Sequence, residues 1–153
     1  MDYTIRKPNR LQEYDYATAG AYFITICTKN RAKILSEVRS VGDDAYIVPT
    51  PIGRLVDTYV QSIPGIDKYI VMPNHIHMII CIDDGPMWAS APTQSIPSRI
   101  RSFKTLITKE LGYSIFQRSY YDHIIRGEQD YGDVWQYIDQ NPVRWPEDTF
   151  YTP

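Results

Sequence analysis

The sequence lacks several features that would assign a function class directly. It has no excess of basic residues, since 16 Lys and Arg stand against 18 Asp and Glu and the formal net charge is −2. It has only two cysteines, Cys27 and Cys81, and their spacing is not that of a metal-binding finger. No apolar run approaches the length of a membrane span, the polar N-terminus predicts no signal peptide, and no internal repeat occurs. We therefore expect free buried thiols in a reducing cytoplasm, no membrane partner, and at most a local nucleic-acid site.

The composition that remains is that of one ordinary globular domain of 153 residues, 43% hydrophobic and 22% charged. We divide the chain into a basic N-terminal arm over 1–19, a single domain over 20–145 and a C-terminal tail over 146–153. The elements expected from patterning are a strand over 20–30, a loop or small hairpin over 31–49, a helix over 51–63, strands over 67–72 and 75–82, a helix over 97–111, a strand over 119–127 and a helix over 128–141.

The first six regular elements follow the order β-α-β-β-α-β, with the segment at 31–49 left outside the series. This order is that of the ferredoxin-like split β-α-β fold, in which two helices cover one face of an antiparallel sheet. The last helix is an addition to that arrangement. The sequence therefore predicts an α+β domain with an extra C-terminal helix.

Two histidines lie one residue apart in the apolar run VMPNHIHMII, which covers residues 71–80. Because alternate residues of a strand point to the same face, His75 and His77 are expected side by side, on the face shared with Ile79 and Cys81. A bare His-x-His pair is as typical of structural histidines in a strand as of a metal site. The pair alone leaves both interpretations open.

The last helix offers polar groups that could join the histidines. Tyr137 and Asn141 are four residues apart and lie on the flank of an apolar stripe formed by Tyr131, Val134, Trp135 and Ile138. Two imidazoles and an amide oxygen leave coordination positions open, which suits Mg²⁺ or Mn²⁺ in contact with a phosphate better than a closed zinc site. A tyrosine hydroxyl held in line beside such a cation can attack phosphorus.

The sequences PNHIH, YYDHIIR and YIDQNP, in this order, resemble the REP-associated tyrosine transposases, which belong to the single-tyrosine HUH transposases. The resemblance runs from the strand GAYFITICTKN to NPVRW. It implies metal-dependent cleavage and rejoining of single-stranded, hairpin-forming DNA through a 5′-phosphotyrosine. It further implies that Tyr137 is the nucleophile and that His75, His77 and Asn141 are the metal ligands, although relatives often have glutamine where this chain has Asn141.

The remaining expectations concern DNA contacts and a supporting histidine. Basic residues expected to hold DNA lie in the N-terminal arm and on the second helix: Arg6, Lys7, Arg10, Arg99, Arg101 and Lys104. Others follow the first strand, at Lys29, Arg31 and Lys33. His123 is a candidate for a supporting position behind the metal ligands.

Two other function classes are compatible with parts of this pattern. One is a structured-DNA binding module of the same fold that no longer mobilises DNA. The other is a small cupin-type metalloenzyme, which is disfavoured because no glutamate follows His77 within the apolar run. The expected location is the cytoplasm, in association with the nucleoid, and the sequence leaves monomer and homodimer both open.

Overall fold

The computed structural model describes residue 16 and residues 18–83 and 94–152. Its elements, in chain order, are β1 (Gly20–Cys27), the short 3-10 helix η1 (Lys29–Arg31), β2 (Ser36–Val41), β3 (Asp44–Pro49), α1 (Pro51–Gln61), β4 (Ile66–Val71), β5 (His75–Ile82), α2 (Ile96–Leu111), β6 (Tyr121–Ile125), α3 (Gly127–Asp139) and η2 (Trp145–Glu147). The expected order of helices and strands is confirmed, and the segment at 31–49 forms the β2–β3 hairpin.

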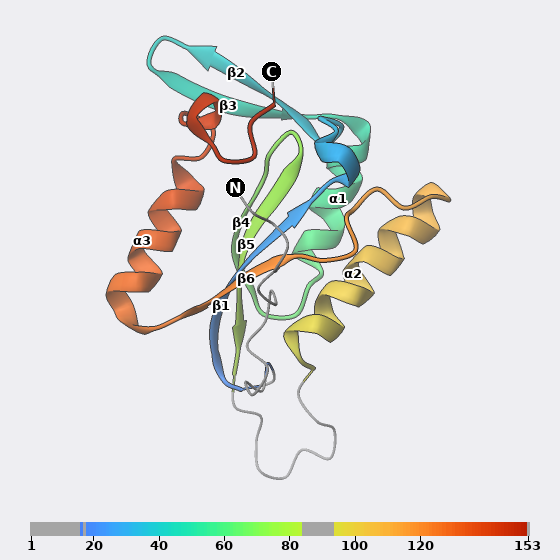
Figure 1. The fold of residues 1–153 in the computed structure, drawn as a ribbon, viewed down its shortest axis with the longest axis vertical. Coiled ribbons are helices and arrows are strands. Elements are labelled where there is room, and N and C mark those ends of the chain that lie inside the picture. Colours follow the sequence, from blue (N-terminus) through green and yellow to red (C-terminus); the bar gives the residue numbers. More distant parts are fainter. Residues whose placement is uncertain (1–15, 17, 84–93, 153) are drawn as a thin grey trace, which may run out of the picture.

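The main sheet has four strands in the order β4-β5-β1-β6, and every neighbouring pair is antiparallel (Figure 1). Helix α1 follows β1 in the chain and precedes β4, at one edge of the sheet. Helix α2 connects the central strand β5 to β6, at the other edge. This split arrangement confirms the ferredoxin-like fold predicted from the element order.

The alternation of β5 divides the domain into two layers. Ile76, Met78 and Ile80 pack into the larger core beneath α1 and α2, whereas Ile79 packs against Val134 and Ile138 of α3 on the opposite face. Figure 1 shows α3 on one side of the sheet and the two connecting helices on the other. The two histidines of β5 therefore face the α3 side, as the strand periodicity predicts.

Local sequence signals set the ends of the connecting helices. The side chain of Thr50 accepts a hydrogen bond from the backbone N–H of Gly53 and caps α1, and the side chain of Ser95 caps α2 in the same way through Ser98. Each helix also has a proline in its first turn, where no intrahelical N–H is needed. Helix α2 ends at Gly112, whose φ of 82° is readily adopted by glycine.

The sequence pattern wrongly assigns Trp135 to the buried apolar stripe of α3. Trp135 is 40% exposed, and its ring stacks under the ammonium group of Lys68 at 3.7 Å. The stripe that covers the sheet is formed by Tyr131, Val134 and Ile138. A four-stranded sheet offers α3 only a narrow apolar strip, so the large indole lies at its margin. In the described part of the chain, no helix is long and apolar enough to cross a membrane.

Candidate metal and tyrosine site

Hydrogen bonds fix the orientation of His75. Its Nδ1 lies 2.8 Å from Oδ1 of Asn74, while the amide nitrogen of Asn74 donates to the carbonyl oxygens of Phe150 at 2.7 Å and Arg31 at 3.4 Å. Because those carbonyls can only accept, the amide oxygen of Asn74 must face the imidazole and accept its proton. The Nε2 lone pair of His75 is therefore left free to bind a cation.

His77 is held in a similar manner by the neighbouring strand. Its Nδ1 lies 2.8 Å from the hydroxyl oxygen of Thr25, which is the residue opposite it on β1. The two imidazole rings are 4.5 Å apart and inclined at 71°, and both side chains are almost completely buried. The pair is thus rigid before any ligand arrives.

Among the described residues, three buried polar atoms of this site lack a hydrogen-bond partner: His75 Nε2, His77 Nε2 and Asn141 Oδ1. A buried acceptor without a partner costs about 1–3 kcal/mol, so such atoms are rare and often mark a functional site or an ion. They belong to the three residues that the sequence predicts as metal ligands. Two imidazole nitrogens and one amide oxygen form a donor set that fits a divalent cation.

Asn141 reaches this position from a turn rather than from the helix. Helix α3 ends at Asp139, two residues earlier than the sequence pattern predicts, because the proline at 142 disfavours helical geometry in the residue before it. Asn141 is nevertheless 2% exposed, and its amide nitrogen donates to the carbonyl oxygen of Tyr137 at 3.3 Å.

Asp148 is a site residue that the sequence pattern does not reveal. Its Oδ2 lies 3.7 Å from His75 Nε2, its Oδ1 accepts the backbone N–H of Phe150 at 2.8 Å, and its side chain is 2% exposed. His75, His77 and Asp148 form a group whose ligand atoms lie within 4.8 Å of one another. Nothing in the spacing of the terminal residues indicates this, because the segment at 146–153 has the composition of a polar tail.

The end of the chain closes over the histidines. The ring of Phe150 lies 4.8 Å from that of His75 and 5.9 Å from that of His77, and Trp145 lies 5.9 Å from His75. Within the segment 146–153, which the sequence predicts as a C-terminal tail, Asp148 and Phe150 lie beside the histidines. Burial by these rings is the physical reason why the imidazoles are poorly hydrated.

Tyr137 lies beside the histidines on α3. Its ring is 5.2 Å from that of His77, 6.0 Å from that of Phe23, and its side chain is 41% exposed. Partial burial, with a further contribution from the charge of Asp148, raises the pKa of the Tyr137 hydroxyl, while the side chain of Asn141 acts in the opposite direction. The phenol is thus protonated at neutral pH and accessible from outside.

The pKa values of the two histidines predict how pH affects stability. Burial lowers the pKa of His75 to about 3 and also lowers that of His77 well below its ordinary value. The unfolded chain therefore binds protons that the folded one excludes, so the free energy of unfolding should fall as pH drops below about 6.5. In EDTA we expect His75 to contribute a loss of about 2 kcal/mol between pH 7 and pH 5, and His77 a loss in the same direction, measured by urea unfolding. A His75→Gln protein with the same pH dependence as the wild type would contradict this.

Two further candidates lie away from this site. His123 is on β6, half-exposed, and its Nε2 bonds the carboxylate of Asp130 at 2.8 Å rather than a group of the histidine pair.

Arg99 is 7% exposed, and its guanidinium donates to the carbonyl oxygens of Gln94 at 2.9 Å and Pro64 at 2.5 Å. Two of its donors, Nε and Nη1, are therefore used inside the domain; this burial does not favour the DNA contact expected of Arg99, which stays a prediction. Arg6, Lys7 and Arg10 lie outside the described residues.

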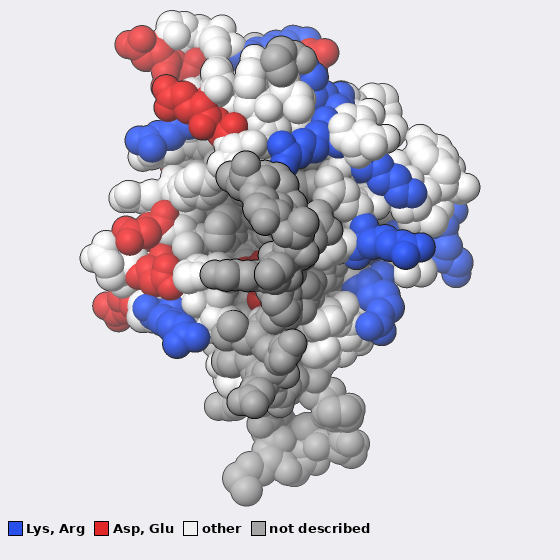
Figure 2. Space-filling view, viewed as in Figure 1, with Lys and Arg blue, Asp and Glu red and all other residues white. Residues whose placement is uncertain are grey.

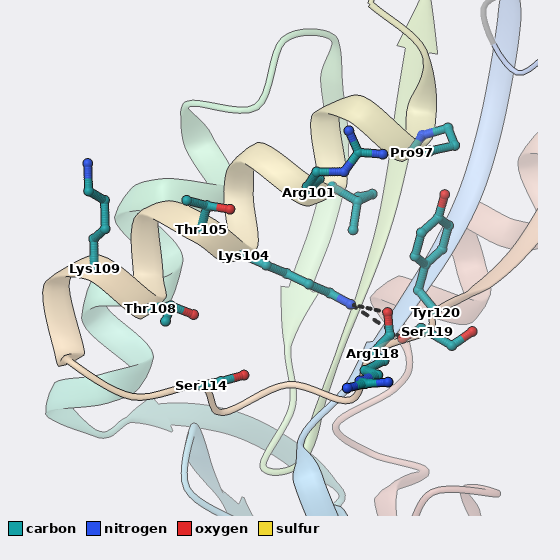
Figure 3. A pocket seen from close by; sticks show the side chains of 11 residues that line it. Pro97, Arg101, Lys104, Thr105, Thr108, Lys109, Ser114, Arg118, Ser119 and Tyr120 are labelled. Carbon is teal, nitrogen blue, oxygen red and sulfur yellow. Dashed lines mark hydrogen bonds between the residues drawn. The ribbon is translucent and has the colours of Figure 1, made fainter.

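Arg101 and Lys104 line a cleft of about 750 Å³ between α2 and the segment 113–120, shown in Figure 3. We call it the α2 cleft; it is lined by Pro97, Ile100, Arg101, Lys104, Thr105, Thr108, Lys109, Ser114, Arg118, Ser119 and Tyr120. This lining contains four basic residues and no acidic one. Lys104 crosses the cleft and donates to the carbonyl oxygens of Gln117, Arg118 and Ser119, at 2.8 to 3.4 Å.

The surface charges are separated although the net charge is nearly zero. On the face shown in Figure 2, most Lys and Arg lie on the side of α2, and most Asp and Glu lie on the opposite side, where α3 lies, beside a smaller share of the basic groups. The acidic residues of α3 are Glu128, Asp130, Asp133 and Asp139. A polyanion would therefore be attracted to one side of the molecule and repelled from the other.

Comparisons with known proteins find relatives over most of the chain. No family profile matches it. An uncharacterized protein of Haemophilus influenzae is 32% identical over 95% of this chain and 93% of its own length. The REP-associated tyrosine transposase of Escherichia coli K12 is 26% identical over 89% of this chain and 79% of its own length.

A solved structure agrees with these sequence relatives. The REP-associated tyrosine transposase bound to a REP hairpin superimposes with a TM-score of 0.64 and 22% identity, over 88% of this chain and 73% of that one. The sequence relatives and the structural relative are the proteins that the motifs PNHIH and YIDQNP resemble. The chain is therefore a homologue of the REP-associated tyrosine transposases, and the resemblance seen in its sequence is confirmed.

Proposed function

We propose that the protein cleaves and rejoins single-stranded DNA beside a hairpin, through a covalent 5′-phosphotyrosine on Tyr137. One observation carries the proposal. The accessible phenol of Tyr137 lies beside three buried atoms that have no hydrogen-bond partner, one each on His75, His77 and Asn141. The hairpin substrate is suggested by the structural relative, which is described as bound to a REP hairpin.

The proposed metal is Mg²⁺ or Mn²⁺, held by His75 Nε2, His77 Nε2 and the side-chain oxygens of Asn141 and Asp148. When bound, such a cation polarises a phosphoryl oxygen and offsets the negative charge that develops in the reaction. The protein supplies the preorganisation, because Asn74 and Thr25 fix both imidazoles with their free nitrogens in place.

The nucleophile in this proposal is the hydroxyl oxygen of Tyr137. As this oxygen bonds to phosphorus, the phenol gives up its proton, the bond from phosphorus to the 3′ oxygen breaks, and that oxygen gains a proton. The product keeps the phosphodiester energy in the tyrosyl ester, so a free 3′-hydroxyl can later reverse the step. The half-exposed ring of Tyr137 leaves room for the strand to approach in line.

The test is incubation with Mn²⁺ and hairpin-containing single strands taken from the flanks of the gene, followed by denaturing electrophoresis. A protein–DNA species that resists denaturation supports the enzyme. Tight binding of the same strands without any such species, at any divalent metal, would overturn the proposal and favour a structured-DNA binding module.

Asp148 provides a separate prediction about the metal. Its Oδ2 lies 3.7 Å from His75 Nε2, within the separation of about 3.0 to 4.2 Å expected for two ligand atoms of an octahedral ion. We expect Asp148→Asn to weaken Mn²⁺ binding by about 10- to 100-fold, measured in DNA-free protein from the signal of unbound Mn²⁺ in electron paramagnetic resonance. Asparagine keeps an oxygen for the N–H of Phe150, so the fold should survive.

The matched control for Asp148 is Glu147→Gln, which makes the same charge change at the exposed neighbouring residue. Glu147→Gln should leave Mn²⁺ affinity unchanged. Equal affinities for the two variants would show that Asp148 does not bind the ion, while leaving the roles of the histidines open to their own test.

A further inference from the structure

A second basic hollow adjoins the α2 cleft, and one arginine belongs to both. The second hollow, of about 620 Å³, is lined by Lys29, Asn30, Arg31, Gln117 and Arg118. Arg118 also lines the α2 cleft. Neither hollow has an acidic residue among its described lining residues, and Lys29, Arg31 and Arg118 are all exposed. Arg118 therefore links the two hollows, and the described lining of both is free of acidic residues.

Hydrogen bonds hold the two hollows in a fixed relation. The segment 115–118 is fastened to the end of β1, because the backbone and side chain of Gln117 donate to the carbonyl oxygens of Cys27 and Thr28, and Lys29 donates to that of Ile115. On its other side, Lys104 fastens the same segment to α2. Arg118 thus projects from a braced segment rather than from a free loop.

Arg31 connects the second hollow to the region of the histidines. The guanidinium of Arg31 lies 5.6 Å from the centre of the Phe150 ring, which in turn lies 4.8 Å from the ring of His75. Asn30 and Arg31 have φ values of 56° and 52°, a left-handed conformation that is uncommon for residues other than glycine. Such strain persists where the surrounding structure imposes it, and it is frequent at functional sites. Here it directs Arg31 toward the cover of the metal site.

We infer that these residues form one binding path for the phosphate backbone of the DNA strand that reaches Tyr137. The path, which we call the basic path, runs from Lys109 and Arg101 in the α2 cleft through Arg118 to Lys29 and Arg31, while Lys104 braces the segment between the two hollows. This inference rests on the proposed function, since it names where the substrate strand lies. It adds a direction: the strand comes around the β6 edge of the sheet and enters the site past Phe150.

The chemistry of the basic path matches a sugar-phosphate backbone. Its cations lie beside the hydroxyl groups of Thr105, Thr108, Ser114 and Ser119, and both types of group donate to phosphate oxygens without regard to base identity. The acidic side chains of α3 lie on the other side of the molecule and would repel a strand from the alternative approach. Phosphate contacts of this kind position a strand and make its affinity depend on salt.

The test measures DNA binding in EDTA, so that no cleavage occurs. We expect Arg118→Gln to weaken binding of hairpin-containing single strands and to reduce the slope of log affinity against log salt by about 0.7 to 0.9 for each phosphate that the variant no longer neutralises. Arg54→Gln is the matched control, because Arg54 is exposed on α1 and lies off the basic path. An unchanged affinity and slope for Arg118→Gln would overturn the inference.

A second experiment tests the direction of the path. A photo-crosslinking amino acid is placed at Ser114, in the α2 cleft, or at Lys29, in the second hollow, and the linked nucleotides are mapped. We expect two separate stretches of one strand, with the stretch linked from position 29 nearer to the phosphate that is cleaved when metal is added. Overlapping stretches, or no crosslinks to DNA from either position, would contradict the path. A valid crosslink map with no covalent adduct in Mn²⁺ would instead remove the proposed function and keep the path.

Discussion

Tyr137→Phe should eliminate the covalent protein–DNA complex while the protein keeps its fold and binds DNA as before. The change removes one oxygen from a side chain that is 41% exposed and preserves the ring that packs beside His77 and Phe23. We therefore expect the free energy of unfolding to change by no more than about 0.5 kcal/mol. Adduct formation on radiolabelled DNA should fall below detection, because phenylalanine has no nucleophilic atom.

The matched control lies in the same helix. Tyr131→Phe also removes a phenolic oxygen from α3, but that oxygen bonds the carboxylate of Asp67 and not a group of the site. Tyr131→Phe should form the adduct at the wild-type rate, with a change confined to stability. Loss of the adduct in both variants would mean that damage to α3, rather than loss of the nucleophile, explains the result.

Divalent metal should stabilise the protein strongly, and this effect should depend on His77. A ligand that binds only the folded state at 100 times its Kd adds about 2.7 kcal/mol to the free energy of unfolding. In His77→Leu we expect that increment and DNA cleavage to disappear together, since leucine fills the space without offering a nitrogen. The metal-free variant should be less stable than the metal-free wild type by about 1–3 kcal/mol at most, because the buried hydroxyl of Thr25 loses its partner while the unpaired Nε2 of His77 is removed.

His123→Gln serves as the control for this experiment, because His123 is half-exposed and bonded to Asp130. It should retain the Mn²⁺-dependent increase in stability and the cleavage activity. Full cleavage by the wild-type protein in excess EDTA would sink the proposed metal requirement.

The fold was predictable because each element has its own local signal. The alternation of β5 assigned its two faces correctly, and Thr50 with the proline after it marked the start of α1. The same periodicity placed Tyr137 on the flank of α3 and both histidines on the face of the sheet that α3 covers. These positions depend on spacing along one element, which a sequence displays directly.

The sequence pattern says less about residues whose environment depends on other segments. Arg99 is expected among the DNA contacts, but its guanidinium donates to the carbonyl oxygens of Gln94 and Pro64. Asp148 lies seven residues beyond Asn141, outside any regular element, and reaches His75 only because the chain end folds back over the site. No periodicity predicts a contact of that kind. The basic path is similar, because it joins residues near 30, 104 and 118 that lie close together only in the folded domain.

The most direct test of the account is to identify the residue that carries DNA after reaction. The protein is incubated with a hairpin-containing single strand and Mn²⁺, digested with trypsin and nuclease, and the modified peptide is sequenced by mass spectrometry. The account predicts a nucleotide 5′-phosphate ester on Tyr137 and a free 3′-hydroxyl on the released strand. DNA attached to any other tyrosine, or cleaved strands with no protein attached, would contradict it.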